Sequence, residues 1–433
     1  MSDLPWVDCL PRSWPKSRGK HLFNRMQRPV RPEDDVVTAF RDGQVTLRSL
    51  RRAEGYTFSN KEIGYQGIRA GDLVIHQMDA FAGAIGVSEA DGKSTPVYTV
   101  LQPRRDDTVD NRFYMYLLRH LAKSDYILSL AKGIRERSTD FRWAELAELE
   151  LPVPPKSIQQ DIVDYLDSET ARIDALIDHK QRFIDLLLEK RGALITNAVT
   201  KGLDPNVEMK DSGVSWIGMI PTHWEAARIK QVARLESGHT PSRQHPEYWT
   251  DCTVPWITTS EVWQVRDGRA EYIADTKEKV SELGLANSSA RKLPAGTVVL
   301  SRTASVGFSA IMPVDMATSQ DFANWVPGPR VTSEFLLYTF RSMRHEFDRL
   351  MMGSTHQTIY MPDIQKFSMP LPPVNEQGRI VEFIRTETRR LDDVVDKTRR
   401  SIDLLREYRT ALISAAVTGQ IDLPGTEASE EVA

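Results

Sequence analysis

Residues that could support catalysis are few in this chain of 433 residues, and they do not form a recognisable catalytic pattern. His239 and His245 are the histidines closest together in sequence, but no third ligand stands at metal-binding spacing beside them. Asp363 with Lys366 is the nearest approach to a nuclease site, and the second carboxylate of a metal-dependent site is missing. Serines occur without the glycine-flanked turn that exposes a nucleophile. We therefore expect no catalytic residue and no bound metal.

Sequence motifs for cofactors are missing as well. The chain has no Gly-x-x-x-x-Gly-Lys-[Ser/Thr] phosphate loop and no glycine-rich fingerprint for dinucleotide or S-adenosylmethionine binding. It also lacks the Asn-Pro-Pro-Tyr type of motif found in aminomethyltransferases, since Pro372-Pro373 is followed by Val374 and introduces a helix. The two cysteines, Cys9 and Cys252, exclude a disulfide framework and a multi-thiolate zinc site. The sequence predicts a protein that is not an enzyme and binds no cofactor of its own.

Composition is that of an ordinary globular protein, with 40% hydrophobic and 27% charged residues, long enough for two or three domains. No apolar run approaches the roughly 20 residues needed to span a bilayer. The first ten residues lack a basic region followed by a long apolar one, so we expect a cytoplasmic protein without membrane contact. The net charge of −4, with no strongly basic region, argues against strong DNA binding by this chain alone.

One long stretch occurs twice and must dictate the architecture. Residues 151–204 match residues 369–422 without a gap, at a shift of 218 positions. Within the match, Ile184-Asp-Leu-Leu187 corresponds to Ile402-Asp-Leu-Leu405. A duplicated element of this length predicts two equivalent halves in one molecule.

Each copy carries an apolar stripe that steps by alternating threes and fours, the a/d spacing of a coiled coil. The stripe of the first copy is Val163, Leu166, Thr170, Ile173, Ile177, Lys180, Ile184, Leu187, Arg191, Leu194 and Ala198. The stripe of the second copy is Val381, Ile384, Thr388, Leu391, Val395, Thr398, Ile402, Leu405, Arg409, Leu412 and Ala416. A single helix with such a stripe would expose it to water, so we predict that the two helices pair. The alternative is two surface helices that each pack on their own neighbouring domain.

An antiparallel pair would place the two globular parts at opposite ends. That orientation predicts Lys180 near Thr398 at mid-coil, where both copies are polar. A buried polar position of this type can fix the register of a coiled coil.

The globular parts also resemble each other. Trp6, Pro11 and Trp14 align with Trp216, Pro221 and Trp224. Both parts contain a glycine turn entering a β-branched strand, followed later by an amphipathic helix. The fold class is therefore α+β: two α/β domains separated and followed by two long helices, with pseudo-two-fold symmetry. The expected domains are 1–150, a helix at 151–204, a domain at 205–368, a helix at 369–423 and a disordered tail at 424–433.

With these residues in view, the whole chain resembles the specificity subunit of type I restriction-modification systems. The first half matches loosely, and it departs at Lys156-Ser-Ile-Gln159, where Ile158 replaces the acidic residue usual in the family. The motifs of the second half match closely: Glu236-Ser-Gly-His-Thr-Pro-Ser-Arg243, Tyr248-Trp249, Pro255-Trp-Ile257, Leu293-Pro-Ala-Gly296, Ala304-Ser-Val-Gly307, Gly353-Ser-Thr355 and Leu371-Pro-Pro-Val-Asn-Glu-Gln377.

The resemblance implies that each globular part is a target-recognition domain for one half of a bipartite, asymmetric double-stranded DNA sequence. The helical pair would set the spacer and bind two methyltransferase subunits, which recruit the motor-nuclease subunits. S-adenosylmethionine, ATP and Mg²⁺ would act in those partners. About 40 helical residues at 1.5 Å each correspond to roughly 60 Å, or about 18 base pairs at 3.4 Å.

Base recognition requires side chains with paired donors and acceptors on loops that reach a groove. In the first domain the candidates are Arg51, Arg52, Lys61, Gln77, Arg135 and Arg137. In the second domain they are Thr240, Ser242, Arg243, Gln244, His245, Ser301, Arg302, Thr303, Ser319, Gln320, His356 and Gln357. The alternative for each is an ordinary solvated or salt-bridged side chain.

Two other functions stay open. The chain could serve a restriction system whose partner fuses methyltransferase and nuclease, which the composition of the purified complex would reveal. It could also be a coiled-coil scaffold that binds no DNA, which unchanged genomic methylation in its absence would indicate.

Overall fold

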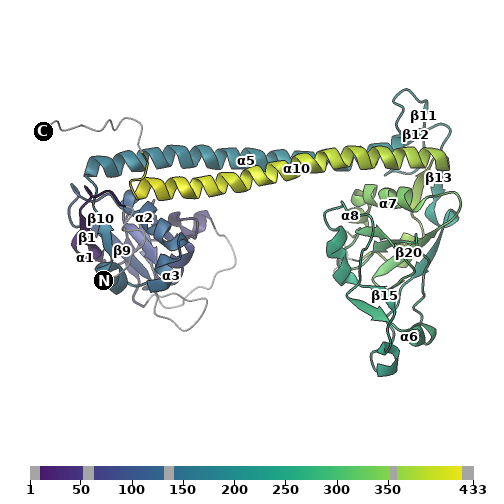
Figure 1. The fold of residues 1–433 in the computed structure, drawn as a ribbon, viewed down its shortest axis with the longest axis horizontal. Coiled ribbons are helices and arrows are strands. Elements are labelled where there is room, and N and C mark those ends of the chain that lie inside the picture. The colour runs from purple at the N-terminus through teal and green to yellow at the C-terminus, as the bar shows by residue number, and fades with distance from the viewer. Residues whose placement is uncertain (1–9, 52–62, 131–140, 352–357, 422–433) are drawn as a thin grey trace. The chain divides into compact units, whose positions relative to one another are not determined.

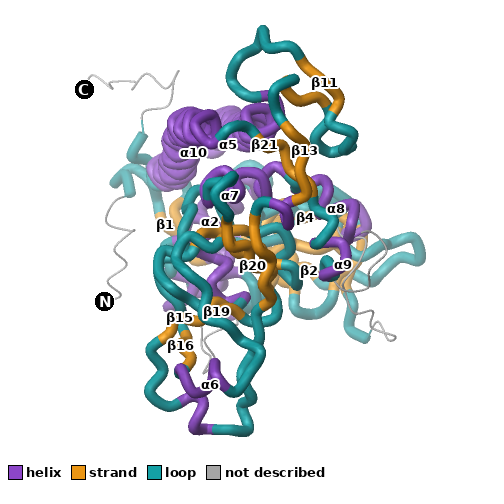
Figure 2. Tube along the Cα trace, turned by 90° about the vertical axis from the view of Figure 1, so that its right-hand side faces the viewer, coloured by secondary structure: helices purple, strands orange, loops and turns teal. Residues whose placement is uncertain are grey.

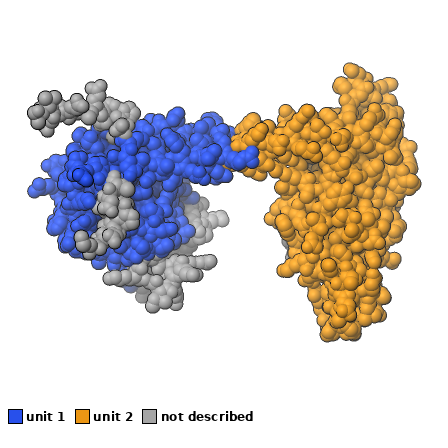
Figure 3. Space-filling view, viewed as in Figure 1, with its two compact units in different colours: residues 1–180, 400–433 blue, residues 181–399 orange. Residues whose placement is uncertain are grey.

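The structure is a computed structural model that describes residues 10–51, 63–130, 141–351 and 358–421. It divides into two compact units, one of residues 1–180 with 400–433 and the other of residues 181–399 (Figure 3). Two long helices contribute to both units (Figure 1): α5 spans Lys156–Lys201 and α10 spans Val374–Val417. Each unit therefore combines one globular domain with part of α5 and part of α10.

A four-stranded antiparallel sheet forms the centre of each domain, and the strand order is the same in both. In unit 1 the order is β2 (Phe23–Met26), β9 (Tyr98–Pro103), β6 (Leu73–His76) and β7 (Ile85–Val87). In unit 2 it is β14 (Ala233–Ser237), β20 (Phe322–Pro327), β17 (Val298–Ser301) and β18 (Ser309–Ile311). The expected glycine turn precedes β6 and β17, where Gly71 and Gly296 adopt φ values of 90° and 85°. The expected amphipathic helices follow as α2 (Asn111–Lys123) and α7 (Ser333–Ser342).

Shorter elements complete each domain (Figure 2). In both, an early strand pairs with the strand that leads into a long helix: β1 with β10 in unit 1 and β13 with β21 in unit 2. The remaining elements of unit 1 are β1 (Lys16–Arg18), α1 (Gly19–Leu22), β3 (Val37–Ala39), β4 (Val45–Leu47), η1 (Arg48–Leu50), β5 (Gln66–Ile68), η2 (Ala80–Ala82), β8 (Gly92–Ser94), α3 (Tyr126–Leu130), α4 (Trp143–Glu148) and β10 (Glu150–Pro152). Those of unit 2 are β11 (Met209–Asp211), β12 (Met219–Pro221), β13 (Glu225–Arg228), η3 (Ile229–Gln231), η4 (Pro246–Trp249), β15 (Val254–Ile257), η5 (Thr259–Val265), β16 (Glu278–Val280), α6 (Glu282–Ala286), β19 (Ala317–Thr318), α8 (Arg344–Met351), α9 (Met361–Ile364) and β21 (Ser368–Leu371).

The helices α5 and α10 pack together in an antiparallel arrangement, as the repeated stripe predicts. In unit 1 the core joins Leu166 near the start of α5 to Leu412 near the end of α10. In unit 2 it joins Ile195 near the end of α5 to Ile384 near the start of α10. All 22 stripe positions named above are buried or half-buried, and none is exposed.

The end of each long helix is anchored on a tryptophan from the start of a domain. Gly202 follows α5 with φ of 73°, and a Cβ atom there would lie 3.1 Å from the Trp224 ring. Gly419 follows α10 with φ of 68°, and a Cβ atom there would lie 2.5 Å from Pro11 and 2.9 Å from Trp14. Glycine therefore ends both helices where the chain turns left-handed against an aromatic ring.

Duplicated ion pairs set the register of the helices. In unit 1, Arg409 Nε lies 3.0 Å from Asp174 Oδ1, and in unit 2, Arg191 Nε lies 3.2 Å from Asp392 Oδ1. The 218-residue shift relates the two arginines to each other and the two aspartates to each other. Both pairs cross between the helices over the length of an arginine side chain, about one helical turn. The pairing of Lys180 with Thr398 at mid-coil stays a prediction; Lys180 is half-buried and Thr398 is buried.

A buried glutamine in the first turn of each long helix connects that helix to its domain. Gln159 Oε1 accepts a hydrogen bond of 2.8 Å from the amide of Asp110, the residue that caps α2. Gln377 Oε1 accepts one of 2.9 Å from the amide of Thr332, the residue that caps α7. Each glutamine also donates from Nε2 to two backbone carbonyls, which belong to Thr108 and Pro154 in unit 1 and to Arg330 and Pro372 in unit 2.

Replacing Gln159 by alanine should therefore destabilise unit 1. The substitution leaves the half-buried Asp110 amide, the half-buried Thr108 carbonyl and the buried Pro154 carbonyl without their partner, which we expect to lower the free energy of unfolding by about 3 kcal/mol. Exposed Gln160 is the matched control, and Gln160→Ala should change stability by less than about 0.5 kcal/mol. Denaturant unfolding of the full chain measures both. Equal effects of the two substitutions would contradict this role for Gln159.

Candidate nucleic-acid interface

The central sheets of the two domains present candidate side chains at equivalent places, along the edge formed by the carboxyl ends of the inner strands β6 and β17. Gln77 directly follows β6 and Arg302 directly follows β17. Their backbones are held alike, because Gln77 O accepts from the amide of Phe141 at 3.1 Å and Arg302 O accepts from that of Ile359 at 2.9 Å. The 218-residue shift also relates Phe141 to Ile359. The backbone at this edge is thus fixed by main-chain bonds, whatever side chain stands there.

In unit 2, several of the candidates converge at this edge. Thr240 Oγ1 donates to Gln320 Oε1 at 2.6 Å, and Arg302 Nε donates to the carbonyl of Gln320 at 3.0 Å. Gln320 is exposed, whereas Thr240 and Arg302 are half-buried. Ala304 follows in the left-handed region at φ of 59°, which is costly for a residue with a Cβ atom and is often associated with functional loops. The arrangement offers a guanidinium and an amide side by side at the surface.

Three neighbouring candidates support this edge from inside. Ser301 is fully buried and Ser319 is 3% exposed. Ser319 Oγ donates to Asp321 Oδ2 at 3.0 Å, and half-buried Thr303 pairs with Thr358 in an isolated β-bridge. Their burial favours a role in shaping the loop over direct contact with a base.

A second group of candidates surrounds the aromatic residues of η4. The Arg243 guanidinium stacks over the Trp249 ring at 3.7 Å and forms an ion pair with Glu278. The His245 ring stacks on Tyr248 at 4.8 Å. Exposed Ser242 and Gln244 bond only within this turn: Ser242 O accepts from the Trp249 indole and Ser242 Oγ accepts from the Gln244 amide. Arg243 is thus restrained by intramolecular contacts.

The tryptophans differ from each other in exposure. Trp256 is buried and Trp249 is half-buried against it, with ring centroids 5.4 Å apart. Trp263 in η5 is 72% exposed and is therefore not a core residue.

In unit 1, the described candidates are Arg51 and Gln77. Arg51 forms an ion pair of 2.7 Å with Asp42 and lies over the Phe40 ring at 4.4 Å. Half-buried Gln77 donates from Nε2 to Thr99 Oγ1 at 3.2 Å. Six further candidates lie outside the described residues: Arg52, Lys61, Arg135, Arg137, His356 and Gln357.

A network of charges that the sequence analysis missed attaches the domain of unit 2 to α10. Arg269 donates to both carboxylate oxygens of Asp396 at 2.7 Å. Arg385 donates to both oxygens of Glu271 at 2.9 and 2.6 Å, and the Tyr338 hydroxyl adds a third bond to Glu271 at 2.8 Å. Burial raises the pKa of Glu271, but the bonds from Arg385 and Tyr338 outweigh it and hold that pKa below its usual value.

This network includes a repeated motif. Arg266-Asp-Gly268 precedes Arg269, and the same three residues occur as Arg41-Asp-Gly43 in unit 1. The Arg341 side chain of α7 donates to the carbonyls of Gly268 and Ala270 at 2.8 and 2.5 Å. A second Arg-Asp-Gly turn in the sequence was the signal that could have revealed this attachment.

Metal-ligand clusters and membrane-spanning helices are not found among the described residues. Across 10–51, 63–130, 141–351 and 358–421, no three His, Cys, Asp or Glu side chains gather as metal ligands. In the same ranges no helix has the length and apolarity to cross a membrane. Two similar sheet edges carried by paired helices are what a two-domain recognition protein requires.

Comparison with known proteins gives the family. The family model described as "Type I restriction modification DNA specificity domain" matches residues 95–182 and 221–402, which is more than half of the chain. The chain therefore belongs to this family and is a DNA specificity subunit of a type I restriction-modification system. This subunit is non-catalytic in type I systems, as the sequence predicts.

Individual relatives agree with the assignment. The EcoR124I/EcoR124II specificity subunit of Escherichia coli is 22% identical over 378 residues, covering 83% of this chain and 84% of that protein. The MjaIX specificity subunit of Methanocaldococcus jannaschii is 28% identical over 198 residues, but the match covers only 45% of this chain and 44% of that protein.

Solved structures share the fold. A chain from a type I R-M system, studied for complex assembly and conformational transition, matches with a TM-score of 0.72 and 15% identity, covering 95% of this chain and 99% of that one. The HsdS subunit from Thermoanaerobacter tengcongensis matches with a TM-score of 0.55 and 16% identity, covering 95% and 98%. The α+β architecture with paired long helices is thereby confirmed.

The Glu271 network predicts how the stability of unit 2 depends on pH. Because the folded-state pKa of Glu271 is lowered, its contribution is fully present above the usual value of 4.5 and is lost as pH falls through the folded-state pKa. Glu271→Gln should destabilise the protein by about 1 to 3 kcal/mol at pH 7 and reduce the loss on acidification. Urea unfolding at pH 7 and at lower pH measures this, with Glu208→Gln at an exposed position as control. A wild-type acid response in Glu271→Gln would contradict the assignment.

Proposed function

We propose that each domain recognises one half of a bipartite, asymmetric DNA target, and that α5 and α10 set the spacer between the halves. The observation that carries the proposal is the duplicated sheet edge, with Gln77 and Arg302 at equivalent positions after β6 and β17. Two copies of one scaffold with different side chains at that position are suited to two different DNA half-sites. This arrangement also disfavours a scaffold protein without a DNA partner.

The chemistry of the edge in unit 2 fits base recognition. Among the described residues Arg302 uses only Nε as a donor, to the carbonyl of Gln320. Its terminal nitrogens are left for the O6 and N7 acceptors of guanine, which arginine binds bidentately in the major groove. The amides of Gln320 and Gln77 have the donor and acceptor that adenine requires.

The helices also offer two equivalent surfaces for partner subunits. Unit 1 exposes Leu176 of α5 and Leu404 of α10, at 43% and 65%. Unit 2 exposes Val394 of α10 and Leu186 of α5, at 39% and 63%, and the 218-residue shift relates these residues to the first pair. We assign these surfaces to two methyltransferase subunits, because duplicated apolar side chains suit two copies of one partner.

The partners then supply what this chain does not. The motor-nuclease subunits join through the methyltransferases, and S-adenosylmethionine, ATP and Mg²⁺ act in those partners. With a net charge of −4, this chain provides base contacts while the methyltransferases provide most contacts to the phosphates. The lone chain should accordingly bind its target more weakly than the assembled complex does at the same salt concentration.

Methylation tests the recognition surface directly. Replacing Arg302 and Gln320 by alanine together should abolish or redirect adenine methylation at the native target while the complex still assembles, since each lost bidentate contact costs about 1 to 3 kcal/mol of discrimination. Genome-wide mapping of methylated bases, with the purified complex checked for its subunits, gives the result. Arg344→Ala, at an exposed position in α8, is the control. An unchanged methylome with the double variant would reject this surface and favour a scaffold role.

The docking surfaces predict a stoichiometry. Leu404→Glu should remove the partner from unit 1 alone and Leu186→Glu the partner from unit 2 alone, because a charge is costly to bury in an apolar contact. Each single variant should bind one methyltransferase and the double variant none, as measured by native mass spectrometry. Exposed Asp403→Ala serves as a neighbouring control. Two bound copies in the double variant would place the docking surface elsewhere.

The helix length predicts the spacer. Inserting four residues, one helical turn, near the middle of both helices adds about 6 Å to each, equivalent to about two base pairs at 3.4 Å. Coiled coils accommodate a four-residue insertion by local unwinding. The methylated sequence should then keep both half-sites and contain a longer spacer. Loss of either half-site with an unchanged spacer would show that the helices do not set the distance.

A further inference from the structure

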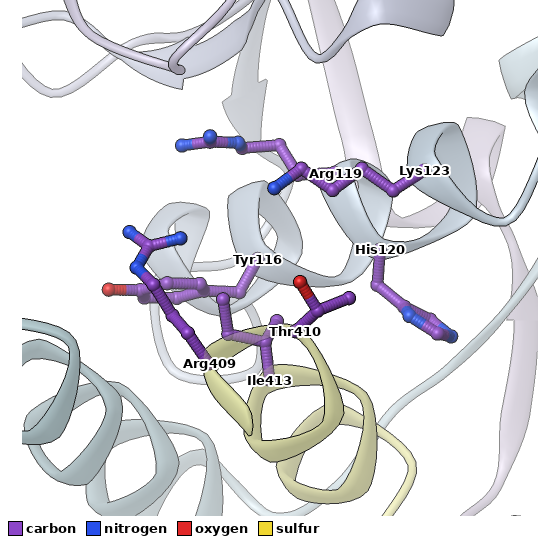
Figure 4. A pocket seen from close by; sticks show the side chains of 7 residues that line it. All are labelled: Tyr116, Arg119, His120, Lys123, Arg409, Thr410 and Ile413. Atoms are coloured by element: carbon purple, nitrogen blue, oxygen red, sulfur yellow. The ribbon is translucent and has the colours of Figure 1, made fainter. Parts of the chain in front are cut away.

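A cleft in unit 1 gathers positive charge that the recognition surface does not use. It lies between α2 and the last part of α10, with Arg119 and Lys123 on one side and Arg409 and Thr410 on the other (Figure 4). The cleft is shallow: the space within it is about 20 Å³, room for about one water molecule, so a larger group would lie at its open mouth. Figure 4 shows the side chains of Arg119 and Lys123 extending in the same direction from α2, across from Arg409.

Two of these cations lack compensation within the described residues. Asp174 and Asp42 are the carboxylates that act on Arg119, but Asp174 is bonded to Arg409 and Asp42 is bonded to Arg51. Half-buried Arg119 itself has no hydrogen bond or ion pair among the described residues, and neither has Lys123. Burial, followed by repulsion from neighbouring cations, lowers the pKa of both Arg119 and Lys123.

In the domain of unit 2, a similarly placed arginine has hydrogen-bond acceptors for its side chain. Arg341 of α7 stands three residues after Tyr338, as Arg119 of α2 stands three residues after Tyr116. Arg341 donates to the carbonyls of Gly268 and Ala270. Arg119 instead lies against Gly43, where an added Cβ atom would be 1.7 Å from its Nη1 atom, and it has no such acceptor there. The N–H donors that Arg341 uses in unit 2 are therefore available to a ligand on Arg119 in unit 1.

We propose that this cleft binds a phosphate group. Arginine matches the oxygens of phosphate with parallel N–H donors, and lysine adds a point charge. A phosphate group presents oxygen acceptors to both cations at once, whether it is a phosphodiester with one negative charge or a terminal phosphate with up to two. This site stands on the cleft and its charges, and it holds whether or not the sheet edges recognise DNA bases.

Titration of the full chain with inorganic phosphate at constant ionic strength tests the site. Wild-type protein should bind phosphate saturably, and Arg119→Gln and Lys123→Gln should each weaken binding about tenfold or more. Arg119→Lys should retain part of the affinity, and Arg400→Gln, at an exposed cation on α10, should retain all of it. Lys123 is exposed, so Lys123→Gln decides the matter if Arg119→Gln fails to fold. Absence of saturable binding, or equal binding by wild type and Lys123→Gln, would overturn the proposal.

A second measurement distinguishes the possible sources of the phosphate group. If the group is a phosphodiester of bound DNA, Lys123→Gln in the assembled complex should reduce the dependence of log affinity on log salt by about one. If the group is free phosphate or a nucleotide, that slope stays unchanged while phosphate binding by the full chain is still lost. Both outcomes support the site and differ only in its ligand.

Discussion

The apolar stripe on each long helix is the constraint on which the rest of the molecule depends. Neither α5, with 46 residues, nor α10, with 44, could leave that stripe in water, so each requires the other. A seam of mostly apolar side chains tolerates sliding, and the ion pairs Arg409–Asp174 and Arg191–Asp392 restrict it. A one-turn slip would break both pairs, in which Arg409, Arg191 and Asp392 are half-buried. Together with the stripe, these two pairs favour one register of the helices over its neighbours.

Each domain is attached to its long helix by equivalent glutamine–backbone hydrogen bonds, but the charged groups at the two attachments differ. Gln159 and Gln377 make the same three bonds in both units. Beyond them, Tyr116 donates to Asp167 of α5 in unit 1, whereas the position related to Asp167 in α10 is Arg385. Glu271 then bridges Tyr338 and Arg385 in unit 2. The two units thus share the hydrogen bonds of the glutamines but differ in the charged groups between domain and helix. In each unit a carboxylate accepts a hydrogen bond from the tyrosine hydroxyl, Asp167 in unit 1 and Glu271 in unit 2.

Much of this fold could be predicted from the sequence, because repetition and periodicity are local signals. The stripe, the strands after Gly71 and Gly296, and the amphipathic helices are all present where the patterns place them. The stripe gives the buried face of each helix, but the ion pairs Arg409–Asp174 and Arg191–Asp392 join distant parts of the chain and could not be predicted from it. Among the candidate site residues, a polar type alone could not show that Ser301 and Ser319 are buried, or that Arg243 is held by Trp249 and Glu278. These depend on loops brought together from distant parts of the chain.

The backbone at the ends of β6 and β17 is held independently of the side chains there. At the sheet edge, the carbonyl groups of Gln77 and Arg302 fix the chain through bonds to Phe141 and Ile359, and neither bond involves a side chain. A glutamine and an arginine therefore occupy the same place without altering the backbone around them. If these side chains contact bases as proposed, a substitution here would change the contacted base and leave the core and the glutamine caps unaffected. Under the proposed function, new DNA targets would arise by changing a few half-buried side chains at the ends of β6 and β17, with the paired helices unchanged.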